Sequence, residues 1–106
     1  MVERQESGKL VRDRIPEIIR VNGGDPRVVI LDDREYALAL QAKVHEELEE
    51  LLASPVDKRV GELADILEVL YGLAEHYGID WDTVEEARLH AKHERGGFEG
   101  RVWMRP

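Results

Sequence analysis

Two pairs of carboxylates with helical spacing stand in the middle of the chain. Glu47 and Glu50 form an E-x-x-E pair, and Glu62 and Asp65 form an E-x-x-D pair after eleven further residues. Residues three apart lie on one face of a helix. The chain has no cysteine, and four oxygen donors favour a hard divalent cation, Mg²⁺ or Mn²⁺, over Zn²⁺ or Cu²⁺. We therefore expect these four residues to hold a metal ion.

The second pair is unusual because it interrupts an apolar helix. Glu62 and Asp65 point nearly opposite to one apolar face, and the side chains around them are also apolar. A helix that is apolar nearly all round should be largely buried, and buried carboxylates need a partner, usually a cation. The residues of the first face are Val60, Leu63, Leu67, Leu70, Tyr71 and Ala74, and those beside the two acids are Ile66, Val69, Gly72 and Leu73.

The preceding helix is rich in glutamate, and its apolar arc indicates which acids point inward. Glu47 falls just inside one edge of this arc, with Glu50 and Lys43 on the rim. Glu46 and Glu49 are expected to point further toward water. Taken alone, this run could be an ordinary solvated surface. The arc consists of Tyr36, Leu40, Val44, Leu48, Leu51 and Leu52.

Four helices are expected, at about 13–21, 33–53, 55–76 or 55–77, and 81–95. Ser54 and Asp57 could form a capping box around Pro55 at the start of the third helix. The link before this helix is short, and short links make antiparallel neighbours, so the two acidic pairs should approach one level. The expected fold is all-α, an antiparallel helical hairpin of four-helix-bundle type. RVVIL (27–31) and RVWM (101–104) could add a minor two-stranded ribbon.

Composition limits the class of protein. The net charge is −8 over 106 residues, which argues against non-specific nucleic-acid binding. No apolar run is long enough for a membrane span, and the opening MVERQES is charged, unlike a signal peptide. A single domain covering residues 1–106, cytoplasmic, is expected. A core this thin would gain from association with another copy.

Basic residues stand near both ends of the chain. Lys9, Arg12 and Arg14 precede or begin the first helix, and Lys92 and Arg95 lie in the last turn of the fourth. Cations suit a helix C-terminus through its dipole, so the second pair needs no functional explanation. The functional alternative is that these residues meet the phosphates of a nucleotide held on the metal.

Four motifs occur together over nearly the whole chain. They are KLVRDRIPEII, K-x-x-E-E-x-x-E at 43–50, ELAD at 62–65 and K-x-E-R-G-G-F at 92–98. In this order they resemble the MazG-like superfamily, closest to its branch of phosphoribosyl-ATP pyrophosphohydrolase-like, house-cleaning enzymes. The eleven-residue gap between the acidic pairs is short for that family, and the SPVD turn accounts for it.

The resemblance implies a Mg²⁺-dependent enzyme that splits a nucleoside triphosphate into a monophosphate and pyrophosphate, working as a homodimer or dimer of dimers. It implies that Lys43 lies beside the site. The chemistry also calls for a base: a carboxylate not fully used by the metal, Glu46 or Glu47, could take the proton of the attacking water, and the sequence does not decide between them. The resemblance further implies that Lys92 and Arg95 contact phosphate. The metal ligands by this resemblance are Glu47, Glu50, Glu62 and Asp65.

Two other functions are compatible with the residues. The chain could be a catalytically silent nucleotide-binding module that uses the same site. It could also be a helical dimerisation or partner-binding module in which Glu62 and Asp65 pair with basic residues. The preferred base, sugar and modification of the nucleotide stay open.

Overall fold

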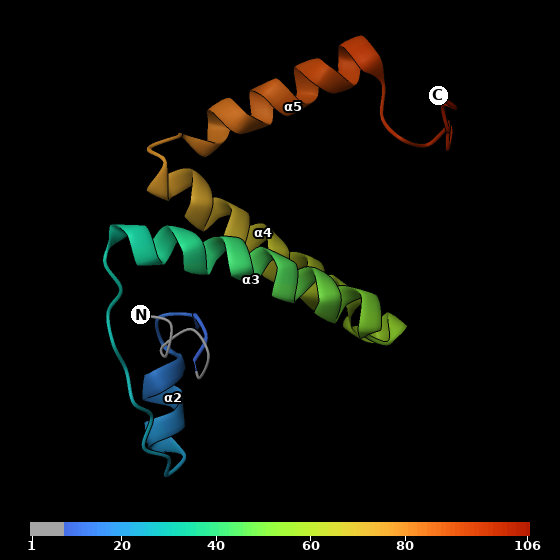
Figure 1. Cartoon of the computed structure of the whole chain (residues 1–106). Helices are drawn as coiled ribbons and strands as arrows, with labels where there is room; N and C mark the ends of the chain where they lie inside the picture. The colour runs from blue at the N-terminus through green and yellow to red at the C-terminus, as the bar shows by residue number, and fades with distance from the viewer. Residues whose placement is uncertain (1–7) are drawn as a thin grey trace. The chain divides into compact units, whose positions relative to one another are not determined.

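The computed structural model describes residues 8–106, and these residues form helices and no strand (Figure 1). The chain divides into two compact units, the first ending at Leu73 and the second beginning at Ala74. The expectation about a signal peptide concerns residues 1–7, which lie outside the described range. Within that range, no helix is both long and apolar enough to cross a membrane. The elements are α2 (Ile15–Val21), α3 (Asp33–Ala53), a 3₁₀ helix η1 (Val56–Lys58), α4 (Arg59–His76) and α5 (Trp81–Arg95).

The first unit is built on the antiparallel pair of α3 and α4. Gly72 of α4 lies against Leu40 near the start of α3, whereas Glu62 near the start of α4 lies against Glu47 further along α3. This reversed order defines an antiparallel hairpin. A Cβ atom at position 72 would stand only 3.2 Å from Leu40 Cδ2, so glycine allows the two helices to approach closely at this level.

The start of α3 is fixed by a capping box. Asp32 accepts a hydrogen bond from the Glu35 backbone, and the Glu35 side chain accepts one from the Asp32 backbone. These bonds satisfy two backbone groups that would otherwise lack a partner at the helix end. The structure thus confirms the expected start of this helix at residue 33.

The expected capping box at Ser54 is wrong. Ser54 is the C-cap of α3, and its hydroxyl donates to the Leu51 carbonyl at 2.9 Å. The hydroxyl therefore serves the preceding helix, and the next helix begins as a 3₁₀ turn after Pro55 with no side-chain cap. The other helix bounds agree with expectation to within two residues, and Gly78 and Gly96, both at positive φ, follow the ends of α4 and α5.

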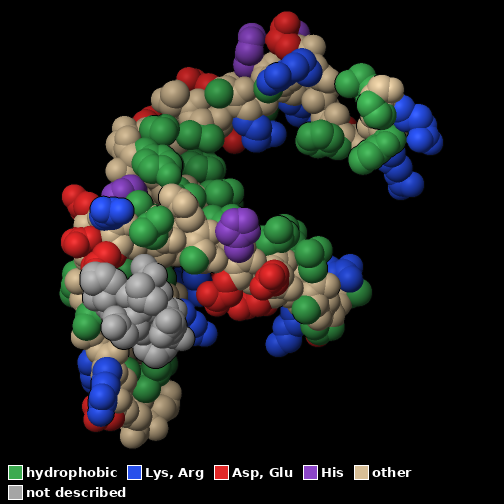
Figure 2. Space-filling view, in the orientation of Figure 1, with side chains coloured by type: hydrophobic (Ala, Val, Ile, Leu, Met, Phe, Trp, Pro, Cys, Tyr) green, Lys and Arg blue, Asp and Glu red, His purple; other side chains and the backbone are tan. Residues whose placement is uncertain are grey.

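The expectation that α4 is largely buried is only half right. Val69, on the side that carries Glu62 and Asp65, is buried. On the opposite face only Ala74 is buried, and the other five residues are exposed, from 81% at Val60 to 37% at Leu70; hydrophobic side chains are visible on the surface in Figure 2. We call this face the α4 stripe; it consists of Val60, Leu63, Leu67, Leu70 and Tyr71.

The two-stranded ribbon is not present in the described residues. The segments 27–31 and 101–104 have no regular secondary structure. Their apolar side chains are largely exposed, with Ile30 at 91% and Trp103 at 84%. β-branched composition favours an extended backbone, but a strand also needs a partner for its backbone groups.

Candidate metal centre

Glu47 is the central residue of the acidic site. It is 5% exposed, the one buried charged residue found among residues 8–106. Its Oε2 lies 3.3 Å from Lys43 Nζ, while its Oε1 is buried and has no hydrogen-bond partner. Leaving a buried carboxylate oxygen without a partner is unfavourable. This atom therefore indicates that a ligand belongs beside it.

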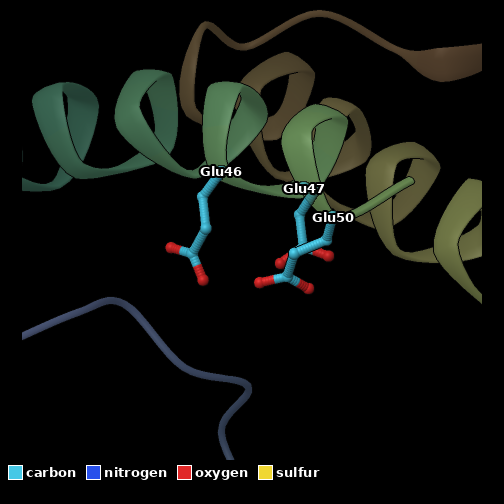
Figure 3. A group of neighbouring side chains, drawn as sticks. All are labelled: Glu46, Glu47 and Glu50. Atoms are coloured by element: carbon cyan, nitrogen blue, oxygen red, sulfur yellow. The ribbon is translucent and has the colours of Figure 1, made fainter. Parts of the chain in front are cut away.

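Two groups of carboxylates share Glu47. One joins it to Glu46 and Glu50 on α3, and the other joins it to Glu62 and Asp65 on α4; in each group the oxygens lie within 4.8 Å of one another. Figure 3 shows the three α3 side chains pointing to the same side of the helix. Acidic side chains gather on the hairpin at this level in Figure 2.

The donor set fits a hard divalent cation. Glu62 Oε2, like Glu47 Oε1, is buried without a hydrogen-bond partner, so each helix supplies one such oxygen. All donors in both groups are carboxylates, which suit Mg²⁺ or Mn²⁺. Glu47, Glu62 and Asp65 would hold one ion, and Glu50 extends the donor set on the α3 side.

The charges of the cluster act on its titrating groups. The negative charge of Glu47, followed by burial and by the charges of Glu46 and Glu62, raises the pKa of Glu50. Burial lowers the pKa of Lys43, but its hydrogen bonds and charge pairing with Glu46 and Glu47 outweigh this, and the net pKa is raised. Lys43 is therefore a cation at neutral pH and cannot accept a proton from water.

A second basic residue reaches the cluster from the N-terminal segment. Arg12 Nη2 donates to Asp65 Oδ1 at 2.7 Å, and both side chains are about half exposed. The pair joins residues 53 apart in sequence and ties the segment before α2 to α4. It also places one positive charge on the α4 side of the carboxylate group.

The site carries an excess of negative charge. Its five carboxylates, Glu46, Glu47, Glu50, Glu62 and Asp65, face two cations, Lys43 and Arg12. The difference is three negative charges. A divalent cation would remove most of this excess and supply the missing partner of the buried oxygens.

The remaining basic residues named from sequence make no ion pair with these carboxylates among those described. Arg14, the N-cap of α2, is exposed and lies 3.8 Å from Glu17 in the first turn, and Lys9 is exposed. In the second unit, Lys92 lies 3.5 Å from Glu99 and Arg95 is exposed. A phosphate-binding role for these four stays a prediction.

Two features of the site were not predicted from the sequence. Glu46, expected to point toward water, is half-buried, because Lys43 three residues earlier holds it at 3.1 Å. Their spacing along one helix was the available signal. The contact of Arg12 with Asp65 had no sequence signal, since it depends on where the segment before α2 lies.

Comparison with known proteins places these observations in a family. A family model described as phosphoribosyl-ATP pyrophosphohydrolase matches residues 26–93, well over half of the chain. This range includes Lys43 and all the carboxylates of both groups, but not Arg12.

One protein of Mycolicibacterium smegmatis, itself described only as uncharacterised, is 54% identical over 46 residues. The match covers 43% of this chain and 47% of that protein, so the chain spans about half the length of this relative. No solved structure matches the chain.

Proposed function

Because the chain belongs to the phosphoribosyl-ATP pyrophosphohydrolase family of the all-α MazG-like superfamily, we propose that it is a Mg²⁺-dependent nucleoside triphosphate pyrophosphohydrolase. The reaction takes up one water, breaks the anhydride bond between the α- and β-phosphates, and releases a nucleoside monophosphate and pyrophosphate. The observation that carries the proposal is the pair of buried, unpartnered carboxylate oxygens on Glu47 and Glu62. They lie in one group of three potential ligands.

The site residues would divide into metal ligands and a proton acceptor. Glu47, Glu50, Glu62 and Asp65 would hold Mg²⁺ (or Mn²⁺), which when bound neutralises phosphate charge and acts as a Lewis acid. Glu46 lies in the α3 group but not in the group shared with α4, so it is our candidate for taking the proton of the attacking water. Glu47 is the alternative base.

Lys43 is a positioning residue in this proposal. Its ammonium lies 3.1 Å from Glu46 and 3.3 Å from Glu47, and its raised pKa keeps it charged. It would hold the proposed base and the central ligand in fixed relation. A Lys43→Met variant should lower turnover and metal affinity together, because both carboxylates lose their shared partner.

The substrate phosphates need cations outside the metal site. Arg12 is a candidate by geometry, because it contacts Asp65 of the carboxylate group. Lys9, Arg14, Lys92 and Arg95 complete the set proposed to contact phosphate, on the strength of the terminal motifs. Such contacts would stabilise charge that develops on the leaving pyrophosphate.

The reaction is tested by product analysis. The protein with Mg²⁺ would be offered NTPs, dNTPs, modified nucleotides and phosphoribosyl-ATP, and the products resolved by anion exchange. Monophosphate and pyrophosphate from one of these substrates, lost in EDTA and in Glu62→Gln, would support the proposal. Glu68→Gln is the matched control, since Glu68 lies exposed on the same helix outside both groups and should keep full activity.

The substrate range distinguishes two roles. Preference for noncanonical triphosphates would indicate house-cleaning of the nucleotide pool, and preference for phosphoribosyl-ATP would indicate the reaction for which the family is named. Either substrate is found where nucleotides are made, so the proposal includes a cytoplasmic location.

A silent nucleotide-binding module is the alternative. It predicts that a non-hydrolysable triphosphate with Mg²⁺ raises the melting temperature, while no product forms from any member of the panel. Because the same residues would bind the ligand, only product formation separates the two functions.

We further propose that the chain acts as one domain and as a homodimer or dimer of dimers. The family match runs across the boundary between the two units without a break, which supports one domain. The α4 stripe supports association, because exposed apolar faces of this kind mark interaction surfaces. Leu63→Glu should lower the mass measured by light scattering, whereas Leu89→Glu, at similar exposure on α5, should leave it unchanged.

A further inference from the structure

We propose that Arg12 makes divalent-cation binding depend on phosphate: it competes with a free cation for Asp65, and transfers to phosphate when cation and phosphate arrive together. This inference rests on the metal site proposed above. It concerns a residue outside the range 26–93 that the family model matches.

The first observation is an asymmetry within the ligand group on the α4 side. Glu47 and Glu62 each present a buried oxygen with no partner, whereas Asp65 accepts a hydrogen bond from Arg12 at 2.7 Å. An entering cation therefore finds an unpartnered buried oxygen on Glu47, whose other oxygen lies 3.3 Å from Lys43, and another on Glu62. Asp65 differs because its carboxylate is already paired with Arg12.

The second observation is the position of that compensating charge. The Asp65 ligand atom lies within 4.8 Å of those of Glu47 and Glu62, and the guanidinium is in direct contact with Asp65 Oδ1. A cation held by the three carboxylates would consequently stand close to Arg12. Two positive charges at this separation repel, so Arg12 weakens the binding of a cation that arrives alone.

The third observation is that Arg12 is open to solvent and lies outside the two helices of the hairpin. Its side chain is 56% exposed, and it lies on the segment before α2 rather than on α3 or α4. A guanidinium presents a planar set of donors that fits phosphate oxygens as well as a carboxylate. When a cation brings phosphate with it, Arg12 can exchange Asp65 for the phosphate and leave Asp65 to the cation.

The consequence is positive coupling between two ligands. Repulsion by Arg12 disfavours the bare ion, and attraction by Arg12 favours the ion with its phosphate. Such coupling is reciprocal, so the cation should strengthen phosphate binding by the same factor. The site would thus discriminate against free Mg²⁺ and select Mg²⁺ that carries a polyphosphate.

The test is calorimetric and uses Mn²⁺ as the cation and imidodiphosphate, a non-hydrolysable pyrophosphate analogue, as the phosphate. In Arg12→Gln, Mn²⁺ alone should bind about two- to fivefold more tightly than in the wild type, and the Mn²⁺–imidodiphosphate complex about two- to fivefold more weakly. These factors correspond to a half-exposed ion pair. Arg20→Gln is the matched control, because Arg20 is an exposed arginine in the last turn of α2 that is not among the residues proposed to contact phosphate, and it should change neither constant.

Several outcomes would overturn the inference. Unchanged or weaker binding of Mn²⁺ alone in Arg12→Gln would mean that Arg12 orients Asp65 for the ion instead of competing with it. Equal effects in Arg20→Gln would mean that Arg12 acts only through the overall charge of the protein and not through its contact with Asp65. Arg12→Lys provides a second variant that keeps the charge: it should bind Mn²⁺ alone as the wild type does but lose part of the coupling, and full coupling in it would contradict the role given to the guanidinium.

Failure of the proposed function gives a different result. If the carboxylates do not form a cation site, Mn²⁺ binding will be absent in the wild type or unaffected by Glu47→Gln. If Mn²⁺ binds and Glu47→Gln removes it, the site exists and the Arg12 variants alone decide the present inference, whether or not a nucleotide is hydrolysed.

Discussion

Glu47→Gln should remove most of the stabilisation that Mg²⁺ gives the folded chain, while changing the metal-free protein much less. The substitution keeps the shape of a side chain that is only 5% exposed. In metal-free protein Lys43 retains Glu46 at 3.1 Å, and one of the crowded negative charges disappears. With Mg²⁺ present, the variant loses the carboxylate that both ligand groups share.

The magnitude follows from linkage between binding and folding. Mg²⁺ at about 100 times its dissociation constant stabilises a folded protein by about 2.7 kcal/mol. Removing even a residue that only supports a metal ligand lowers affinity roughly 10- to 100-fold, so loss of the shared ligand should lower it about 100-fold. The same Mg²⁺ then contributes about 0.4 kcal/mol. For a domain of this size the difference corresponds to a melting temperature about 9–18 °C lower.

The assay is thermal unfolding followed by circular dichroism, in EDTA and across a series of Mg²⁺ concentrations. Glu49→Gln is the matched control, since it makes the same change on the same helix at an exposed residue outside both groups. Its Mg²⁺-dependent shift should equal that of the wild type. An equal shift in Glu47→Gln would refute the placement of the cation at Glu47, and a shift absent from all three proteins would refute the cation site itself.

Three further predictions concern the hairpin that carries the site. Leu40→Ala should lower the free energy of unfolding in urea by about 2–5 kcal/mol, because the Leu40 side chain is only 3% exposed. Leu38→Ala is the control and should lower it clearly less, because Leu38 is 47% exposed. Equal losses would contradict the assigned core. Gly61→Ala should raise the free energy of unfolding in urea by about 0.5–1 kcal/mol, because its added Cβ meets nothing within 4 Å. The gain should be larger than that of Gly72→Ala, whose Cβ would press on Leu40 of the neighbouring helix, and equal gains would contradict the close approach of the two helices. Like-charge repulsion raises the pKa of Glu50 above 4.5, so the metal-free fold should lose this group's contribution to stability as pH rises from 4.5 through the raised pKa. Urea unfolding in EDTA at a series of pH values should show that the free energy of unfolding depends less on pH in Glu50→Gln than in the wild type. Identical pH dependence in the two proteins would count against the repulsion.

Sequence periodicity predicted the parts of the fold that depend on local rules. The range of α3, Asp33–Ala53, and that of α5, Trp81–Arg95, agree with the structure residue for residue. Apolar spacing, capping residues and terminating glycines are all read from neighbouring positions. The inward direction of Glu47 followed from the same spacing, because its place on the helix circumference is fixed by its distance from the apolar residues.

Choices between equivalent local partners could not be predicted in this way. Ser54 can cap the helix before it or the helix after it, and the sequence permits both. Each face of α4 is apolar, so periodicity alone does not state which face meets α3; the structure shows that it is the one with Val69, with the α4 stripe exposed. The contact between Arg12 and Asp65 depends on the path of a segment without regular structure.

The short link between α3 and α4 has a consequence for chains of other lengths. Only residues 54 and 55 separate the end of α3 from the 3₁₀ helix η1, so the link leaves little room to absorb extra residues. An insertion that lengthens the hairpin has to add equal rise to both helices, or the E-x-x-E and E-x-x-D pairs move to different levels. It also has to add whole turns, because each extra helical residue rotates the rest of the helix by about 100°. Related chains should therefore differ in the spacing between Glu50 and Glu62 by steps of about seven residues, one turn on each helix, with other lengths carried in an enlarged loop at the tip.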